Sequence, residues 1–389
     1  MSAKITYFPV GNGDMTLIQT DSGKSILIDC NIRTGDEHPD VITMLRKRLP
    51  KDSEGRTFLH LFVWSHPDQD HCGGIREHFH LGKSQDYDEE KDLIFINEIW
   101  SSPMVYRRAS KNFTLTKDAK ALKKEVKRRI ERFKDVESMK DGEYVQIVCE
   151  DEDGKTDDVI DIVLDLDSTT SCINGEIDST IAARILGPSP KPDLDEDEDK
   201  YSKNKSSVII NYSLDADGVK SKARFLSGGD AEVVCWEALI KRMEDDGTVS
   251  NLDYNILQAP HHCSWHVMSH ESQSKAKEEG TIAKPSGKAL KALGQALSNA
   301  IIVSSSNTIE NDDNDPPSYA AKEEYEKIVD DVEGIFKCVA DNVKDGEQRP
   351  LEIEIKGGSN PKVKALATLT VGSGTPNRAT NRGDSDRYA

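Results

Sequence analysis

The side chains best suited to chemistry in this chain lie between positions 66 and 71. The stretch Trp64-Ser65-His66-Pro67-Asp68-Gln69-Asp70-His71-Cys72-Gly73-Gly74 places two imidazoles and two carboxylates within six residues. Neutral imidazole and carboxylate groups suit Zn, Mn or Fe, and four of them exceed what one ion usually takes from one loop. The spacing therefore indicates a hydrolytic site with two metal ions. The alternative is a polar turn in which Asp70 caps a helix.

The residues before this cluster predict an element that would hold it rigidly. Residues 58–64 form a largely apolar run, which is typical of a strand buried on both faces. Two later segments repeat the arrangement, because Asp230 and the pair His261-His262 also follow apolar runs. Each is weak alone, since strand ends often carry Asp or His in turns. Three such strand ends in one chain favour a shared site.

The rest of the chain alternates strand and helix patterns, as layered α/β folds do. Strands are expected over 4–9, 15–20, 25–29, 58–64, 95–100, 143–150, 181–186, 207–214, 222–226, 254–258, 301–304, 335–340 and 351–355. Helices are expected over 38–49, 114–141, 231–243 and 319–332. In this interpretation Asp29 ends the third strand.

The longest expected helix, 114–141, has an apolar stripe and a basic opposite face. The basic residues are Lys117, Lys120, Lys123, Lys124, Lys127, Arg128, Arg129 and Arg132. A basic face on an acidic protein could contact a phosphate backbone. The alternative is an amphipathic helix whose polar face is solvated and binds nothing.

Length and composition describe a globular protein. The chain has 389 residues, 36% of them hydrophobic and 31% charged, which is enough for a large core. No apolar run reaches the ~20 residues that span a bilayer. The N-terminus shows no signal-peptide pattern, so we expect a cytoplasmic protein without membrane contact. Seven dispersed cysteines favour free thiols over a disulfide framework.

The net charge of −19 weighs against a protein that coats nucleic acid by bulk electrostatics. It does not exclude a nuclease, because bound cations reverse the local field where a phosphate docks. Part of the acidity is also local, since residues 193–199 contain six carboxylates and one leucine. Such a block is typical of a solvated loop.

The three strand ends that carry His66 to His71, Asp230 and His261-His262 resemble segments of the metallo-β-lactamase superfamily. The most similar branch is the hydrolase domain of the ComEC-type DNA-uptake proteins. The likeness extends over most of the chain, from about residue 5 to about residue 342. The segments that carry it are 8–14, 26–29, 66–74, 226–232 and 260–264. The resemblance implies an α+β protein with the metallo-β-lactamase fold. That fold is an αββα sandwich with its site at one edge of the sheets.

The resemblance also implies a role for each candidate residue. The implied metal ligands are His66, Asp68, Asp70, His71, Asp230 and His261. His66 and Asp68 would hold one ion. The second ion would be held by Asp70, His71 and His261, and Asp230 would bridge the pair. No third histidine for the first ion has a clear match in this chain.

Several residues are expected to support the reaction. Asp70 and Asp230 would orient the nucleophile, and His262 or His266 would protonate the leaving oxygen or position the phosphate. Asp29 would lie outside the ligand shell and orient residues 66–74, here called the metal loop. Which of His261 and His262 is the ligand stays open at this point.

The domain expected from the sequence covers residues 1–370. It carries a helical insertion near 105–142 and an acidic loop near 187–206, and a disordered tail follows over 371–389. The expected function is metal-dependent hydrolysis, most directly by a phosphodiesterase or nuclease that acts on DNA or another nucleotide polymer. A hydroxide activated by two divalent ions, Zn or Mn, would attack the phosphorus.

Two other functions fit the same residues. The first is hydrolysis of a small ester or phosphodiester by the same metal pair, because the surrounding loops decide the substrate. The second is a binding protein that retained the fold and lost the chemistry. A protein partner or a homo-oligomer also stays open.

Overall fold

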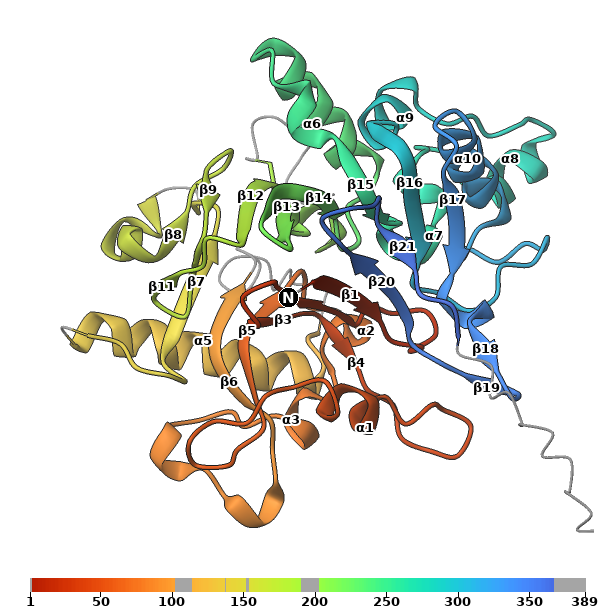
Figure 1. Cartoon of the computed structure of the whole chain (residues 1–389). Helices are drawn as coiled ribbons and strands as arrows, with labels where there is room; N and C mark the ends of the chain where they lie inside the picture. The colour runs from red at the N-terminus through yellow and green to blue at the C-terminus, as the bar shows by residue number, and fades with distance from the viewer. Residues whose placement is uncertain (1, 102–113, 137, 152–153, 190–202, 367–389) are drawn as a thin grey trace, which may run out of the picture.

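The computed structural model describes residues 2–101, 114–136, 138–151, 154–189 and 203–366. Within them two large β-sheets face each other, and helices cover the outer side of each sheet (Figure 1). The tail expected over 371–389 lies outside the described residues. The same is true of most of the acidic loop and of the first part of the helical insertion.

The first sheet has nine strands in the order β21-β20-β1-β2-β3-β5-β6-β7-β8. Their bounds are β1 (Ala3–Tyr7), β2 (Thr16–Gln19), β3 (Ser25–Ile28), β5 (Phe58–Trp64), β6 (Phe95–Ser101), β7 (Tyr144–Val148), β8 (Val163–Leu164), β20 (Leu351–Ile355) and β21 (Lys362–Val363). The strands from β3 to β8 are parallel. In β5, Phe62 and Trp64 belong to the core under the helices, whereas Leu61 and Val63 belong to the core between the sheets. The run is apolar because both faces are buried.

The second sheet has seven strands in the order β17-β16-β15-β14-β13-β12-β9. Their bounds are β9 (Thr169–Thr170), β12 (Ile181–Gly187), β13 (Ile209–Ala216), β14 (Val219–Ser227), β15 (Tyr254–Gln258), β16 (Ala296–Ser304) and β17 (Ile335–Cys338). The strands from β14 to β17 are parallel. Short strands elsewhere are β4 (Cys30–Asn31), β10 (Cys172–Ile173), β11 (Glu176–Ile177), β18 (Val343–Lys344) and β19 (Glu347–Gln348).

Helices complete the four layers. Those of the first half are α1 (Val41–Arg46), α2 (Gln69–Cys72), α3 (Ile75–His78) and α5 (Lys117–Asp135). Those of the second half are α6 (Val233–Asp245), α7 (Pro260–Cys263), α8 (Gln273–Glu279), α9 (Gly287–Leu293) and α10 (Tyr319–Asp330). One apolar core lies between the sheets, and one lies under the helices on each side. Among the described helices none combines the length and apolarity needed to cross a membrane.

The layering agrees with the expected α+β sandwich of two sheets, whereas membership of the metallo-β-lactamase superfamily stays a prediction. The single domain over 1–370 also stays a prediction. Two helices are shorter than expected: residues 38–49 form α1 only over 41–46, and 114–141 form α5 only over 117–135. The α5 boundary follows from Thr116, whose hydroxyl accepts a hydrogen bond from the Ala119 N–H. Apolar spacing alone does not locate such a cap.

Both sheets bring the ends of parallel strands to one edge. In open sheets of parallel strands, sites form beyond these carboxyl ends. At this edge the N–H of Val208 donates to the carbonyl of Ser65 over 3.1 Å. The hydroxyl of Thr16 donates to Oε1 of Gln258 over 2.8 Å. The first contact ties the loop after β5 to the second sheet, and the second ties β2 of the first sheet to β15 of the second.

Candidate metal centre

Asp230 lies at the centre of a buried cluster of histidines and is 2% exposed. Its Oδ1 lies 3.0 Å from Nε2 of His71 and 3.5 Å from Nε2 of His262. Its Oδ2 lies 3.2 Å from Nε2 of His66 and 3.6 Å from Nε2 of His261. The carboxylate therefore faces two separate pairs of imidazoles, one pair at each oxygen.

Several atoms of this cluster are buried without a hydrogen bond. Within the described part of the chain, these atoms include Oδ1 of Asp230 and Nε2 of His66, His71 and His262. A carboxylate oxygen and an unprotonated Nε2 are both acceptors, so neither satisfies the other, and a buried polar atom without a partner is costly. A cation between them satisfies both. The donor set therefore fits a divalent metal ion.

A second geometric test gives the same result. Asp14, His71, Asp230 and His262 each offer one ligand atom, and these atoms all lie within 4.8 Å of one another. All four residues are buried. These residues could hold a metal ion, although the sequence had assigned no role to Asp14. The available signal was its place after the tight turn Gly11-Asn12-Gly13.

Asp29 fixes the orientation of His71. The residue follows β3 and has a left-handed backbone with φ 55°. Its Oδ1 accepts a hydrogen bond from the Ser65 N–H (2.8 Å), and its Oδ2 accepts one from the Ser65 hydroxyl (2.6 Å). Oδ2 also lies 2.8 Å from Nδ1 of His71. This contact favours the proton on Nδ1 and leaves Nε2 free to face Asp230.

Asp14 stands in the same relation to His262. Its Oδ1 lies 3.4 Å from Nδ1 of His262, and its Oδ2 lies 3.9 Å from Nδ1 of His71. Because the Nε2 atoms of both imidazoles face Asp230, Asp14 lies behind the rings. We therefore interpret Asp14 as an orienting carboxylate rather than a ligand. Its backbone N–H also donates to the Asp70 carbonyl over 3.0 Å.

The remaining candidates divide between the two oxygens of Asp230. Oδ2 of Asp68 lies 3.7 Å from Nε2 of His66, on the side that also contains His261. Oδ2 of Asp70 lies 3.2 Å from Nε2 of His262, on the side of His71. The resemblance groups His261 with Asp70, whereas in the structure Asp70 lies beside His262. His261 lies at the other oxygen of Asp230, on the side of His66 and Asp68.

The backbone of α7 explains this exchange. His261, His262 and Cys263 all have left-handed conformations, with φ of 50°, 53° and 69°. Each such residue costs roughly 1–2 kcal/mol when it carries a Cβ. The N–H of His261 donates to the carbonyl of Gly229 over 2.9 Å, which fastens the turn beside Asp230. The unusual turn directs neighbouring imidazoles to different oxygens, and residue types alone do not reveal it.

The electrostatics of the cluster favour cations. Burial alone would lower the pKa of His262, but the charges of Asp230 and Asp14 outweigh it and raise the pKa to about 10. Burial is likewise outweighed at His66, where the charge of Asp230 raises the pKa to about 9. At His261 burial prevails and lowers the pKa. Without a cation, the buried carboxylates therefore favour protonated imidazoles at His66 and His262, and a bound cation would take the place of those protons.

The metal loop is also anchored from α5, which packs against α2. Asp118, in the first turn of α5, accepts hydrogen bonds at Oδ2 from Nε2 of Gln69 (2.8 Å) and from the Gly74 N–H (3.2 Å). Its Oδ1 accepts one from Nε of Arg76 (2.9 Å). The sequence analysis missed this role of Asp118, because only the fold brings the helix to the loop.

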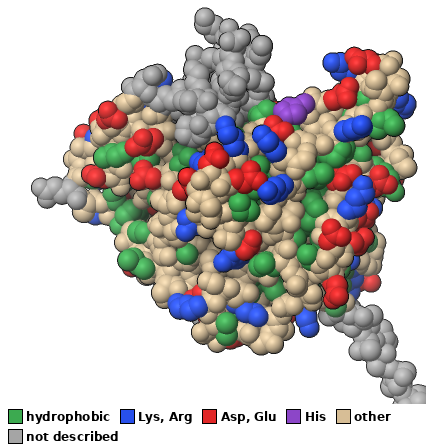
Figure 2. Space-filling model, turned by 90° about the horizontal axis from the view of Figure 1, so that it is seen from above, with side chains coloured by type: hydrophobic (Ala, Val, Ile, Leu, Met, Phe, Trp, Pro, Cys, Tyr) green, Lys and Arg blue, Asp and Glu red, His purple; other side chains and the backbone are tan. Residues whose placement is uncertain are grey.

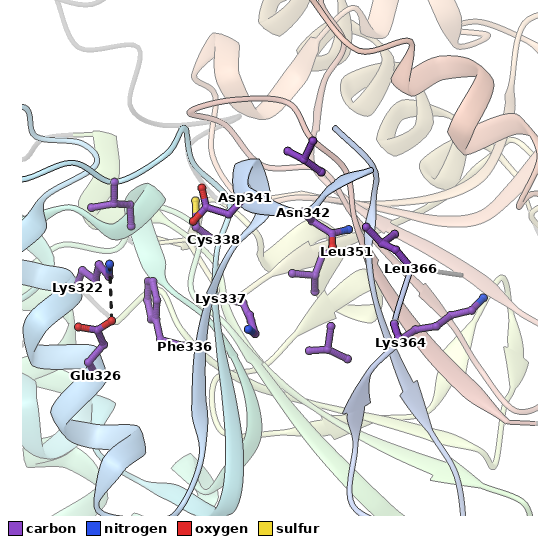
Figure 3. Close-up of a pocket in the computed structure, with 14 residues that line it drawn as sticks. Lys322, Glu326, Phe336, Lys337, Cys338, Asp341, Asn342, Leu351, Lys364 and Leu366 are labelled. Atoms are coloured by element: carbon purple, nitrogen blue, oxygen red, sulfur yellow. Dashed lines mark ion pairs between the residues drawn. The ribbon is translucent and has the colours of Figure 1, made fainter. Parts of the chain in front are cut away.

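A cavity of about 430 Å³ lies away from this cluster, beside α10, β17, β20 and β21 (Figure 3). Its lining includes Phe336, Leu351 and Lys364, together with Lys322, which lies 3.7 Å from Glu326 in an ion pair. None of the side chains around Asp230 lines it. We therefore do not assign the substrate to this cavity.

Comparison with known proteins gives the chain no family. No protein-family model matches it, and no curated protein matches it significantly. Among solved structures, the crystal structure of unliganded yeast PDE1 matches with a TM-score of 0.38 and 12% identity, over 87% of this chain and 96% of that chain. A likeness at this level carries no argument, so the chemistry of the cluster must carry the assignment.

Proposed function

We propose that this protein is a metal-dependent phosphodiesterase that acts on DNA or another nucleotide polymer. The observation that carries the proposal is the position of Asp230, because each of its two carboxylate oxygens faces a separate pair of imidazoles. A carboxylate in this position is suited to bridge two cations. Paired cations are a recurrent device for phosphoryl transfer. The order of the clusters along the chain supports the metallo-β-lactamase superfamily, ComEC type, as the family.

We assign the ligands according to the two oxygens. The first ion would be held by His66, Asp68 and His261, the second by Asp70, His71 and His262, and Asp230 would contact both. Nitrogen and oxygen donors of this kind suit Zn or Mn. When bound, divalent cations lower the pKa of water and neutralise charge on a phosphate ester.

The protein's own residues would then orient the reactants. Asp70 is the accessible carboxylate of the set, with 37% of its side chain exposed. In the absence of a cation, burial raises the pKa of Asp70, but the positive charges of His71 and His262 outweigh burial and hold this pKa below its usual range. A bound cation would act in the same direction and keep the carboxylate ionised. Asp70 can therefore accept a hydrogen bond from an incoming water. His262 is placed to hold a cation rather than to donate a proton to the leaving oxygen, because both of its ring nitrogens face carboxylates.

The proposal is tested first by metal content and then by activity. Protein purified without chelator, or loaded with Zn or Mn, should retain up to two equivalents by elemental analysis. It should hydrolyse bis(p-nitrophenyl) phosphate and DNA. Asp70→Ala should lower both activities by more than about 100-fold, the scale on which loss of one charge-stabilising group acts. Circular dichroism should show that the variant is folded.

The matched control is Asp161→Ala, which removes an exposed carboxylate outside the cluster. It should leave activity and metal content unchanged. A protein that takes up no metal would be a binding protein with the fold alone, and the proposal would fail. Hydrolysis of the small ester without any cleavage of DNA would sink the polymer substrate and keep the hydrolase.

A further inference from the structure

The first three turns of α5 present cations without matching anions. The lysines of this segment are Lys117, Lys120, Lys123, Lys124 and Lys127, here called the lysine row. Four of them are exposed and recur every three or four residues, which places them on one face of the helix. None of the five forms an ion pair with a described residue. Burial and the charge of Lys127 lower the pKa of Lys123, as expected where ammonium groups crowd together.

The two acidic residues of the same segment point inward. Asp118 is 8% exposed and holds the metal loop, as described above. Glu125 is 3% exposed and is engaged by Arg128 at 2.6 Å and Arg129 at 2.8 Å. Neither carboxylate therefore reaches the surface to neutralise the lysine row.

The other basic residues of α5 are paired with carboxylates. Further along α5, Arg132 pairs with Glu143 at 2.9 Å. The face seen from above interleaves acidic and basic side chains (Figure 2). The whole chain carries a net charge of −19. An uncompensated row of cations on such a protein marks a surface for an anionic partner.

The lysine row begins at the turn of α5 that anchors the loop 66–74 through Asp118. Its first members flank Asp118, which is hydrogen-bonded to Gln69 between Asp68 and Asp70. From Lys117 to Lys127 the helix rises about 15 Å. A chain of phosphates lying along the row would therefore have one end at the turn of α5 that anchors this loop. An acidic protein partner would also match the charge of the lysine row, but it would have no need to lie next to the loop of candidate ligands.

We propose that the lysine row of α5 binds the sugar-phosphate backbone of a single nucleic-acid strand and leads it to the metal centre. This inference rests on the proposed function, because it supplies the substrate path for the same site. Lysine contacts to phosphates are sequence-independent and weaken with salt. The row therefore gives affinity and direction along the strand, whereas the metal ligands do the chemistry.

The test replaces the three exposed lysines furthest from Asp118, as Lys120→Gln, Lys124→Gln and Lys127→Gln together. Glutamine has nearly the same helix propensity as lysine, so α5 should be retained. The matched control, also made as one triple variant, is Lys241→Gln, Lys284→Gln and Lys288→Gln. These lysines are exposed and form no ion pair with a described residue. Lys241 and Lys288 lie on α6 and α9, which cover the other sheet, and Lys284 lies in the loop before α9.

Two measurements are made on each protein. The first is the affinity for fluorescein-labelled oligothymidylate, followed by anisotropy in EDTA over a range of salt concentrations. The α5 variant should bind roughly 10–100-fold more weakly at low salt, and its salt slope should fall by about two, since each single-strand contact contributes roughly 0.7. The second is hydrolysis of bis(p-nitrophenyl) phosphate by the metal-loaded protein, which should not change. The control should match the unsubstituted protein in both.

Equal losses in the two triple variants would overturn the inference, because net charge alone would then explain binding. So would displacement of the probe by polyglutamate as readily as by unlabelled oligothymidylate, which would indicate an acidic protein as the partner. Because binding is measured in EDTA, it does not depend on hydrolysis. If the α5 variant binds oligothymidylate as tightly as the unsubstituted protein while both hydrolyse the small ester, the inference about the lysine row fails and the proposed function stands. Row-dependent binding without any hydrolysis contradicts the proposed function instead.

Discussion

The loop after β5 and the turn after β15 each bring two imidazoles to Asp230, but they are held in different ways. The loop after β5 is fixed by contacts around it: Asp29 binds Ser65 and His71, and Asp118 holds the residues that follow. The turn after β15 consists of three consecutive left-handed residues. It is fastened by two backbone hydrogen bonds, from the His261 N–H to Gly229 and from the Ser318 N–H to Cys263, and by the more distant Asp14.

This difference indicates a division of labour within the site. The first loop is organised before any cation binds, because hydrogen bonds to buried carboxylates fix its rings. The turn stores backbone strain, which persists only where the surroundings compensate for it. We infer that bound cations supply part of that compensation. The first loop then acts as the template, and the turn completes the site.

The strongest test of this comparison replaces each of the two orienting carboxylates, in turn, by an amide. Asp29→Asn should weaken metal binding by about 10–100-fold, the usual cost of losing such a partner. Asp14→Asn should cost less, because its oxygen lies 3.4 Å from His262 whereas that of Asp29 lies 2.8 Å from His71. Zinc affinity from competition with a chelator measures both. A larger loss for Asp14→Asn would reverse the roles assigned to the loop and the turn.

The same contrast explains how far the sequence could predict the site. The loop after β5 is local, so the spacing of His66 and its neighbours was enough to indicate ligands on one strand end. The choice between His261 and His262 depends on left-handed backbone angles that no residue type in the turn requires. Asp14 and Asp118 act through contacts with distant elements. Their roles therefore emerge only when the sheets and α5 are assembled.

The fold was predictable to a similar degree. Strands buried on both faces, such as β5, and long amphipathic helices, such as α5, have unmistakable apolar patterns. The helices α8 and α9 were missed, because each has seven residues and the apolar period hardly repeats. The order of the strands within each sheet could not be predicted from the sequence either. The return of β20 to pair with β1 joins the two ends of the described chain, and apolar spacing carries no information about such pairings.

A second test concerns the point where the turn and the loop approach each other. Gly229 has φ 48°, and a Cβ there would lie 2.8 Å from Oγ of Ser65. Gly229→Ala should therefore cost both left-handed strain and a clash, in total about 2–4 kcal/mol. Because Ser65 holds Asp29, metal affinity should also fall several-fold. Urea unfolding in EDTA and zinc titration measure the two effects.

Gly218→Ala is the matched control for this test. Gly218 also has a left-handed backbone, with φ 78°, but a Cβ there meets nothing within 4 Å. It should cost only the conformational strain of roughly 1–2 kcal/mol, with no change in metal affinity. Equal effects of the two substitutions would mean that the contact between Gly229 and Ser65 does not hold the site together.

The smallest effect separates the stability of the first sheet from that of the metal centre. Glu98 lies on β6, next to β5, and outside the cluster around Asp230. Burial raises its pKa from 4.5 to about 7, although a hydrogen bond from the Asn174 N–H and the charge of Arg129 oppose the shift. A carboxyl group whose pKa is higher in the folded state stabilises the fold at low pH. That contribution is lost as the pH rises through the folded value.

The free energy of unfolding in EDTA should therefore respond differently in the two proteins. Between about pH 5 and about pH 8, the unsubstituted protein should lose on the order of 1–3 kcal/mol relative to Glu98→Gln, which has no carboxyl group to titrate. Urea unfolding at each pH gives the difference. Because the metal cluster is common to both proteins, its own titration cancels. Parallel pH profiles would show that Glu98 is not held protonated, and the pH response would then belong to the cluster around Asp230.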